Sequence, residues 1–137
     1  MVLLLSGCSQ KAAFEELANG ACSSEQAQLV DAHISAQIDA MAQQDWKLAY
    51  SFASPGFRSG VDIDQFIFII NAQYGMLLDN QGYAFNACTI ADEKITQEVA
   101  ISTDSEVFNL YYILSVTGGV LGVDSSSTTL SETKLET

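Results

Sequence analysis

The first part of the chain carries apolar residues at helical spacing. Over residues 23–44 they recur every three or four positions, at Val30, Ile34, Ile38 and Met41. This is the period of a helix that buries one face. Ser23, followed three residues later by Gln26, is a capping-box pattern and predicts the beginning of that helix.

Two further helices are predicted before residue 79. A short helix over 46–53 ends at the Ser-Pro-Gly sequence of residues 54–56, because the residue before a proline avoids helical dihedral angles. The pattern Asp62-x-x-Gln65 is a second capping box and predicts a third helix over 62–78.

The second part of the chain changes to strand character. Short runs rich in β-branched and aromatic residues are separated by turn sequences, of which Gly118-Gly119 is a strong hairpin signal. The predicted strands are 83–91, 95–102, 107–117 and 120–130. Three helices followed by a four-stranded antiparallel meander predict an α+β domain with its helices packed on one face of the sheet.

The predicted strand 107–117 is apolar on both faces. Its even-numbered positions from 108 to 116 are all apolar, and on the other face so are Val107, Tyr111 and Ile113. An antiparallel sheet with one solvated face alternates more cleanly. The second face is therefore expected to be covered, and a homodimer is the favoured arrangement. The alternative is that a terminal segment of the same chain, the tether 8–22 or the tail 131–137 described below, covers it.

Composition and charge limit the classes of partner. The chain has 137 residues, with 17 Asp and Glu against 5 Lys and Arg, a formal net charge of −12 and 48% hydrophobic residues. Only 16% of its residues are charged, where a soluble domain has about a quarter, so the acidity comes from missing bases. The length indicates one domain, and the hydrophobic content allows a buried core. The scarcity of bases excludes the electrostatic attraction that nucleic-acid binding requires.

The N-terminus has the pattern of a lipoprotein signal. An apolar run leads into Leu5-Ser6-Gly7-Cys8, which resembles a bacterial lipobox, where two small residues precede the cysteine that accepts the lipid. Fewer residues precede Cys8 than a full signal contains, so the first segment is interpreted as truncated. The expected organisation is a signal segment 1–7, a tether 8–22, a folded domain 23–130 and a disordered tail 131–137.

This organisation predicts a protein of the bacterial cell envelope that faces the periplasm or the cell exterior. Its only link to the membrane would be the acyl anchor on Cys8. In such an oxidising compartment Cys22 and Cys88 can pair, and the bridge would stabilise the domain by roughly 4 kcal/mol in the chain-entropy model. Two separate buried thiols are the alternative, and the sequence leaves both open.

No cofactor and no metal site are predicted. Zinc sites need clustered cysteines and histidines, and His33 is the single histidine. The chain also lacks the nucleophile-elbow, zinc-protease and phosphate-loop motifs.

One stretch of the chain resembles a known family. Residues 30–78 are similar to the N-terminal half of a family of small uncharacterised bacterial domains, commonly exported or lipid-anchored, in the nuclear transport factor 2-like superfamily. The matching positions are Ile34, Gln37, Ile38, Asp45, Ala49, Phe52, Ser54, Pro55, Phe66 and Tyr74. The resemblance implies three helices and a strongly curved antiparallel sheet that encloses a pocket. It implies no activity, because this fold carries enzymes, binding proteins and dimerisation modules alike.

A pocket of this kind has four candidate ligand-binding residues. Tyr50, Tyr74 and Tyr112 combine an apolar ring with a polar tip, and Gln37 lies beside the apolar stripe of the first helix. The alternative is that all four are core residues whose polar atoms are bonded internally. The predicted function is a non-catalytic module that binds a small apolar ligand or an envelope partner. The alternative function is a pocket enzyme of isomerase or dehydratase type that uses a tyrosine or a carboxylate.

Overall fold

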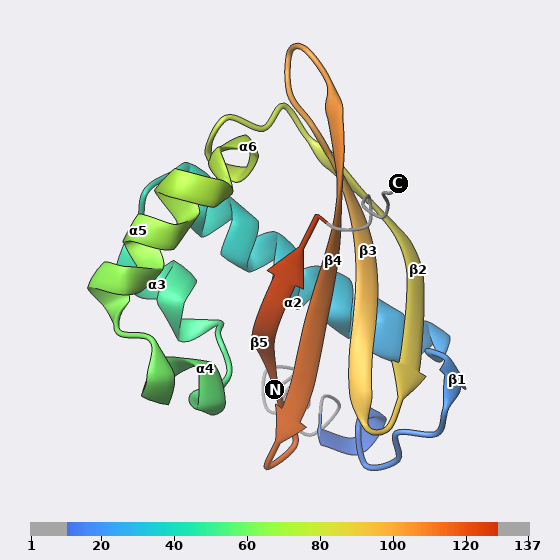
Figure 1. Ribbon diagram of the computed structural model, residues 1–137. Coiled ribbons are helices and arrows are strands. Elements are labelled where there is room, and N and C mark those ends of the chain that lie inside the picture. Colours follow the sequence, from blue (N-terminus) through green and yellow to red (C-terminus); the bar gives the residue numbers. More distant parts are fainter. Residues whose placement is uncertain (1–10, 129–137) are drawn as a thin grey trace, which may run out of the picture.

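The computed structural model describes residues 11–128 (Figure 1). The predicted signal segment, Cys8 and the predicted tail lie outside the described residues. The helices are α2 (Ser24–Ala42), α3 (Trp46–Ser51), α4 (Pro55–Gly60), α5 (Ile63–Gln73) and α6 (Gly75–Leu78). The strands are β1 (Gly20–Ala21), β2 (Tyr83–Ala91), β3 (Lys94–Ser102), β4 (Val107–Thr117) and β5 (Val120–Ser127).

The strands form one antiparallel sheet in chain order, from β1 at one edge to β5 at the other. In Figure 1, α2 crosses one face of this sheet, and α3 to α6 gather beside its β5 edge. None of the helices α2 to α6 lies on the opposite face. The described part is therefore a two-layer α+β structure.

The α+β class was predicted, but the predicted three helices and four strands are wrong. Within residues 11–128 the sheet has five strands, and helices α2 to α6 replace the expected three. Pro55 begins α4, because a proline fits the first helical position, where its missing N–H has no partner to lose. Ser54 caps this helix, its Oγ accepting from Phe57 N at 3.2 Å. The predicted third helix is interrupted at Tyr74, whose φ of −126° and ψ of 38° lie outside the helical region.

Two local predictions are confirmed. Ser23 and Gln26 form a capping box, in which Ser23 Oγ accepts from Gln26 N at 3.1 Å and Gln26 Oε1 accepts from Ser23 N at 2.8 Å. The same box recurs at the start of α5. Gly118 and Gly119 form the β4–β5 turn with φ values of 60° and 83°, which glycine adopts without the steric cost of a Cβ.

Residues 11–22, assigned to a tether from the sequence, pack onto the domain. Phe14 is only 4% exposed, and β1 pairs with β2 at the edge of the sheet. Gln26 Nε2 donates to the carbonyl oxygens of Ala13 at 3.0 Å and Glu16 at 3.2 Å. Gln26 of the α2 capping box thus also holds the segment that precedes the helix.

The core lies on the sheet face that meets α2. Alternate residues of β3 and β4 are buried there, namely Ile95, Gln97, Val99, Ile101, Leu110, Tyr112 and Leu114. On the other face Tyr111 and Ile113 are half-buried and Val107 is 60% exposed. The homodimer expected from this second apolar face stays a prediction.

Backbone contact joins the helical layer to β5. Ser54 N donates to Val123 O at 2.9 Å, and Val123 N donates to Phe52 O at 3.0 Å. A Cβ added at Gly122 would lie 2.5 Å from Ser54 Cα, so this approach of two backbones requires glycine. The contact fixes the segment between α3 and α4 against the edge of the sheet.

Cys22 and Cys88 form a disulfide that joins the segment before α2 to β2. The structure thus has the bridge, one of the two alternatives that the sequence leaves open. The two cysteines are 66 residues apart in the chain, and Cys22 N donates to Cys88 O at 3.0 Å. The disulfide therefore holds the β1 edge of the sheet.

Replacing both cysteines by alanine should lower the free energy of unfolding by roughly 4 kcal/mol, because the bridge limits the entropy of the unfolded chain. Urea unfolding of the full chain, followed by circular dichroism, measures the change. Dithiothreitol should destabilise the wild-type protein by a similar amount and leave the double variant unaffected. Equal stability of the oxidised, reduced and substituted proteins would contradict this stabilising role.

Candidate functional site

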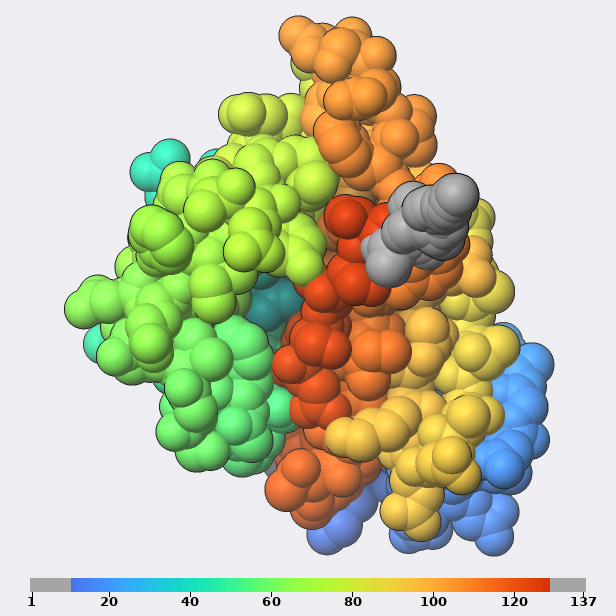
Figure 2. Space-filling view, in the orientation of Figure 1, coloured from blue at the N-terminus to red at the C-terminus, as the bar shows by residue number. Residues whose placement is uncertain are grey.

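A cavity of about 160 Å³ lies between the helices and the β5 edge of the sheet. In Figure 2 it is the hollow between the green atoms of α5 and the red atoms of β5, with atoms of α2 visible on its floor. Most of its wall is apolar and comes from Met41, Phe57, Phe66, Ile70, Leu77 and Val123. Ser54 and Gly122 position this wall, because their contact sets the distance between α4 and β5.

Gln37 and Tyr112 line this cavity, and each is only 2% exposed. Gln37 Nε2 donates to Ala49 O at 3.1 Å, which leaves Gln37 Oε1 as the free end of the amide. Neither Gln37 Oε1 nor the Tyr112 hydroxyl has a hydrogen-bond partner among residues 11–128. A buried polar atom in this state costs about 1–3 kcal/mol.

Burial also acts on the acidity of Tyr112. It raises the pKa of the Tyr112 hydroxyl far above its ordinary value, and the neighbouring Tyr74 and Tyr83 raise it further. The hydroxyl therefore stays protonated at neutral pH and is available as a hydrogen-bond donor.

Of the other predicted binding residues, Tyr74 lines the cavity and Tyr50 does not. The Tyr74 hydroxyl donates to Ser126 O at 2.7 Å, which ties the end of α5 to β5. The Tyr50 hydroxyl donates to Val61 O at 2.6 Å and thereby holds the end of α4. The fold thus brings Gln37, Tyr74 and Tyr112 together and uses Tyr50 for packing.

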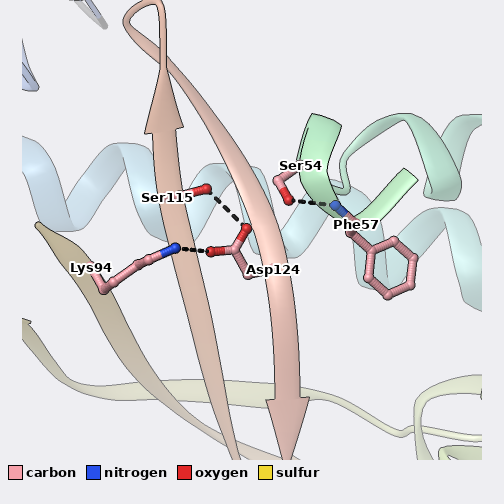
Figure 3. A network of polar contacts seen from close by, with 5 residues as sticks. All are labelled: Ser54, Phe57, Lys94, Ser115 and Asp124. Carbon is pink, nitrogen blue, oxygen red and sulfur yellow. Dashed lines mark hydrogen bonds and ion pairs between the residues drawn. The ribbon is translucent and has the colours of Figure 1, made fainter. Parts of the chain in front are cut away.

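A polar network holds the β5 side of the cavity (Figure 3). Asp124, which lines the cavity, accepts from Lys94 Nζ at 2.7 Å and from Ser115 Oγ at 2.9 Å. Burial alone raises the pKa of Asp124, but hydrogen bonds from Lys94, Ser54 and Ser115, with the Lys94 charge, outweigh it and bring the pKa below its ordinary value. Asp124 therefore remains ionised at neutral pH.

Asp124 and Phe57 were missed from the sequence. The available signal for Asp124 was a lone acidic residue inside a strand of small and apolar residues. Phe57 had no comparable signal, because its place depends on the unexpected helix α4 that follows Ser54.

The remaining titratable candidates lie outside the cavity lining. His33 Nε2 donates to Phe52 O at 2.9 Å. Burial brings the pKa of His33 below its ordinary value, and this hydrogen bond offsets only part of that effect. Asp39 accepts from the Tyr83 hydroxyl at 2.7 Å in an exposed position. Within residues 11–128 there is no group of three or more His, Cys, Asp or Glu side chains that could hold a metal ion.

The sequence pattern of one protein family, described as a domain of unknown function (DUF4864), matches residues 23–119. The chain belongs to the DUF4864 family. No curated protein and no solved structure matches the chain. The region that matches DUF4864 contains Gln37, Tyr74 and Tyr112 and ends before β5, which completes the cavity wall.

Removing the Tyr112 hydroxyl should not destabilise the ligand-free protein. Tyr112→Phe should leave the free energy of unfolding unchanged or raise it by up to ~1 kcal/mol, because the hydroxyl is buried without a partner. Tyr74→Phe is the matched control and should lower it by ~1 kcal/mol, because its hydroxyl is bonded to Ser126 O. Urea unfolding of both variants gives the comparison, and an equal loss in both would show that the Tyr112 hydroxyl has a partner after all.

Proposed function

We propose that this DUF4864 domain binds a small, largely apolar molecule in the cavity beside β5 and carries out no reaction on it. The cavity of about 160 Å³ with its apolar wall carries this proposal. An apolar cavity of ~150 Å³ accepts benzene, whereas pockets for drug-sized ligands measure ~300–1,000 Å³. The ligand is therefore a molecule with one ring or a short chain.

The contacts around the cavity favour binding over catalysis. An isomerase or dehydratase would need a carboxylate within reach of a tyrosine or histidine that works as acid or base. Asp124 is the acidic residue of the lining, and its oxygens accept from Lys94 and Ser115. These bonds support a structural role for Asp124 in holding the wall.

The proposal places the domain in the bacterial cell envelope, anchored by a lipid on Cys8. The lipobox-like sequence Leu5-Ser6-Gly7-Cys8 supports the anchor. The disulfide between Cys22 and Cys88 supports an oxidising compartment, because structural disulfides persist there and are rare in the cytosol of mesophiles. We also propose that the domain is related to the nuclear transport factor 2-like superfamily. The helices that enclose a pocket against an antiparallel sheet support this relationship.

Between residues 11 and 128, no helix has the length and apolar character needed to span a membrane.

The full chain should bind toluene with a Kd on the order of 1 mM or tighter, measured by calorimetry or by NMR shifts of cavity methyl groups. Ile69→Phe should weaken this binding about tenfold or more, because Ile69 lines the cavity and the larger ring occupies it. Ile67→Phe is the matched control, since Ile67 is half-buried on the same helix but outside the lining. Failure to bind any small aromatic probe, or an equal effect of both variants, would contradict a binding function for this cavity.

Lipidation is tested with the chain expressed behind an intact lipoprotein signal. Cys8→Ser should move the protein from the membrane fraction to the soluble fraction, because it removes the thiol that accepts the lipid. The double variant Cys22→Ser and Cys88→Ser keeps Cys8 and should stay in the membrane fraction. Retention of Cys8→Ser at the membrane would refute the lipobox.

A further inference from the structure

Two polar side chains in the lining of this mostly apolar cavity, Gln37 and Tyr112, carry oxygens without partners among residues 11–128. Gln37 comes from α2 and Tyr112 from β4, so they approach the cavity from the helical layer and from the sheet. Both side chains are 98% buried, and each carries an oxygen without a partner in the described part of the chain. Buried polar groups are normally paired. Asp31 and Gln97 also carry such an oxygen, but only Gln37 and Tyr112 belong to the cavity lining.

The chemistry of each oxygen is fixed by its surroundings. Ala49 O is a carbonyl oxygen and can only accept, so the Gln37 amide must direct its nitrogen to this oxygen. Gln37 Oε1 is therefore the amide atom without a partner in the described part of the chain. This oxygen needs a donor. A tyrosine hydroxyl is protonated at neutral pH, and burial raises the pKa of Tyr112 further, so this hydroxyl can both donate and accept.

We propose that the ligand of this cavity is an uncharged molecule with a small apolar body and one hydroxyl or amide head, which donates to Gln37 Oε1 and accepts from the Tyr112 hydroxyl. The inference rests on the proposed binding function and adds the chemical class of the ligand. A purely apolar ligand would leave both oxygens unpaired, which is the situation in which a binding site rejects an analogue that lacks the polar group.

The charges around the cavity argue against an ionic head. No Lys, Arg or His belongs to the lining, and its one charged member is the carboxylate of Asp124. A ligand carboxylate would therefore have no cation to pair with and would lie near a like charge. A ligand ammonium would have to compete with Lys94, whose Nζ lies 2.7 Å from Asp124 Oδ2.

Four probes with similar bodies separate these cases: phenol, toluene, benzoate and benzylamine. The full chain should bind phenol about tenfold more tightly than toluene, a difference of ~1.4 kcal/mol. Benzoate and benzylamine should bind at least tenfold more weakly than phenol. Titration calorimetry at neutral pH measures all four.

Two substitutions should remove the preference for phenol. Tyr112→Phe and Gln37→Met should each weaken phenol binding about tenfold and leave toluene binding within a factor of about two, because the apolar wall is unchanged. Gln37→Met also removes the hydrogen bond to Ala49 O and could prevent folding. Tyr112→Phe removes only an oxygen without a partner among residues 11–128, so it tests the proposal even in that case.

Gln97 and Tyr50 provide matched controls. Gln97 is 1% exposed and also has an Oε1 without a partner in the described part of the chain, but it lies outside the cavity lining and its Nε2 donates to Asn86 O and Glu98 O. Tyr50 also lies outside the lining, and its hydroxyl already donates to Val61 O. Gln97→Met and Tyr50→Phe should therefore both keep the preference for phenol.

Each outcome distinguishes this inference from the proposed function. If phenol and toluene bind equally well, or a charged probe binds best, the cavity is a binding site but the uncharged polar head is wrong. If the preference for phenol survives in Tyr112→Phe, the head lies elsewhere and the inference is overturned. If none of the probes binds, the proposed function itself fails.

Discussion

The close approach of two backbones at Gly122 and Ser54 is the constraint on which the rest of the structure depends. Residues 52–54 exchange hydrogen bonds with Val123, and a Cβ at Gly122 would lie 2.5 Å from Ser54 Cα. This contact holds α3 and α4 beside the β5 edge of the sheet, whereas α2 crosses its face (Figure 1). The cavity is the space that this arrangement leaves between the helices and β5.

The cavity is maintained at a cost in stability. An empty apolar space loses packing contacts, and two buried oxygens without partners add the desolvation cost of polar groups. Other features offset this cost. The disulfide joins the segment before α2 to β2, near the β1 edge, and Lys94, one of only 5 bases in the chain, is bonded to Asp124 in the cavity wall.

The site was only partly predictable. The helical spacing around Val30, Ile34 and Ile38 placed Gln37 beside a buried stripe, and the alternation of β4 placed Tyr112 in the core. Tyr50 and Tyr74 could not be distinguished by residue type, yet the Tyr50 hydroxyl donates to Val61 O and lies outside the cavity lining. Asp124 and Phe57 reach the cavity because a strand edge and an extra helix meet there, and no local pattern encodes that meeting.

The sequence by itself determined the local features of this protein. Capping boxes, the glycine turn and the strand alternation follow from interactions between residues that are close in the chain, and the acidic charge follows from composition alone. The tertiary structure decided what depends on distant residues. It paired Cys22 with Cys88 across 66 residues and divided the predicted third helix at Tyr74. It also left Gln37 Oε1 and the Tyr112 hydroxyl without partners among residues 11–128, beside one cavity. Such contacts depend on how whole elements pack, and several packings satisfy the same local pattern.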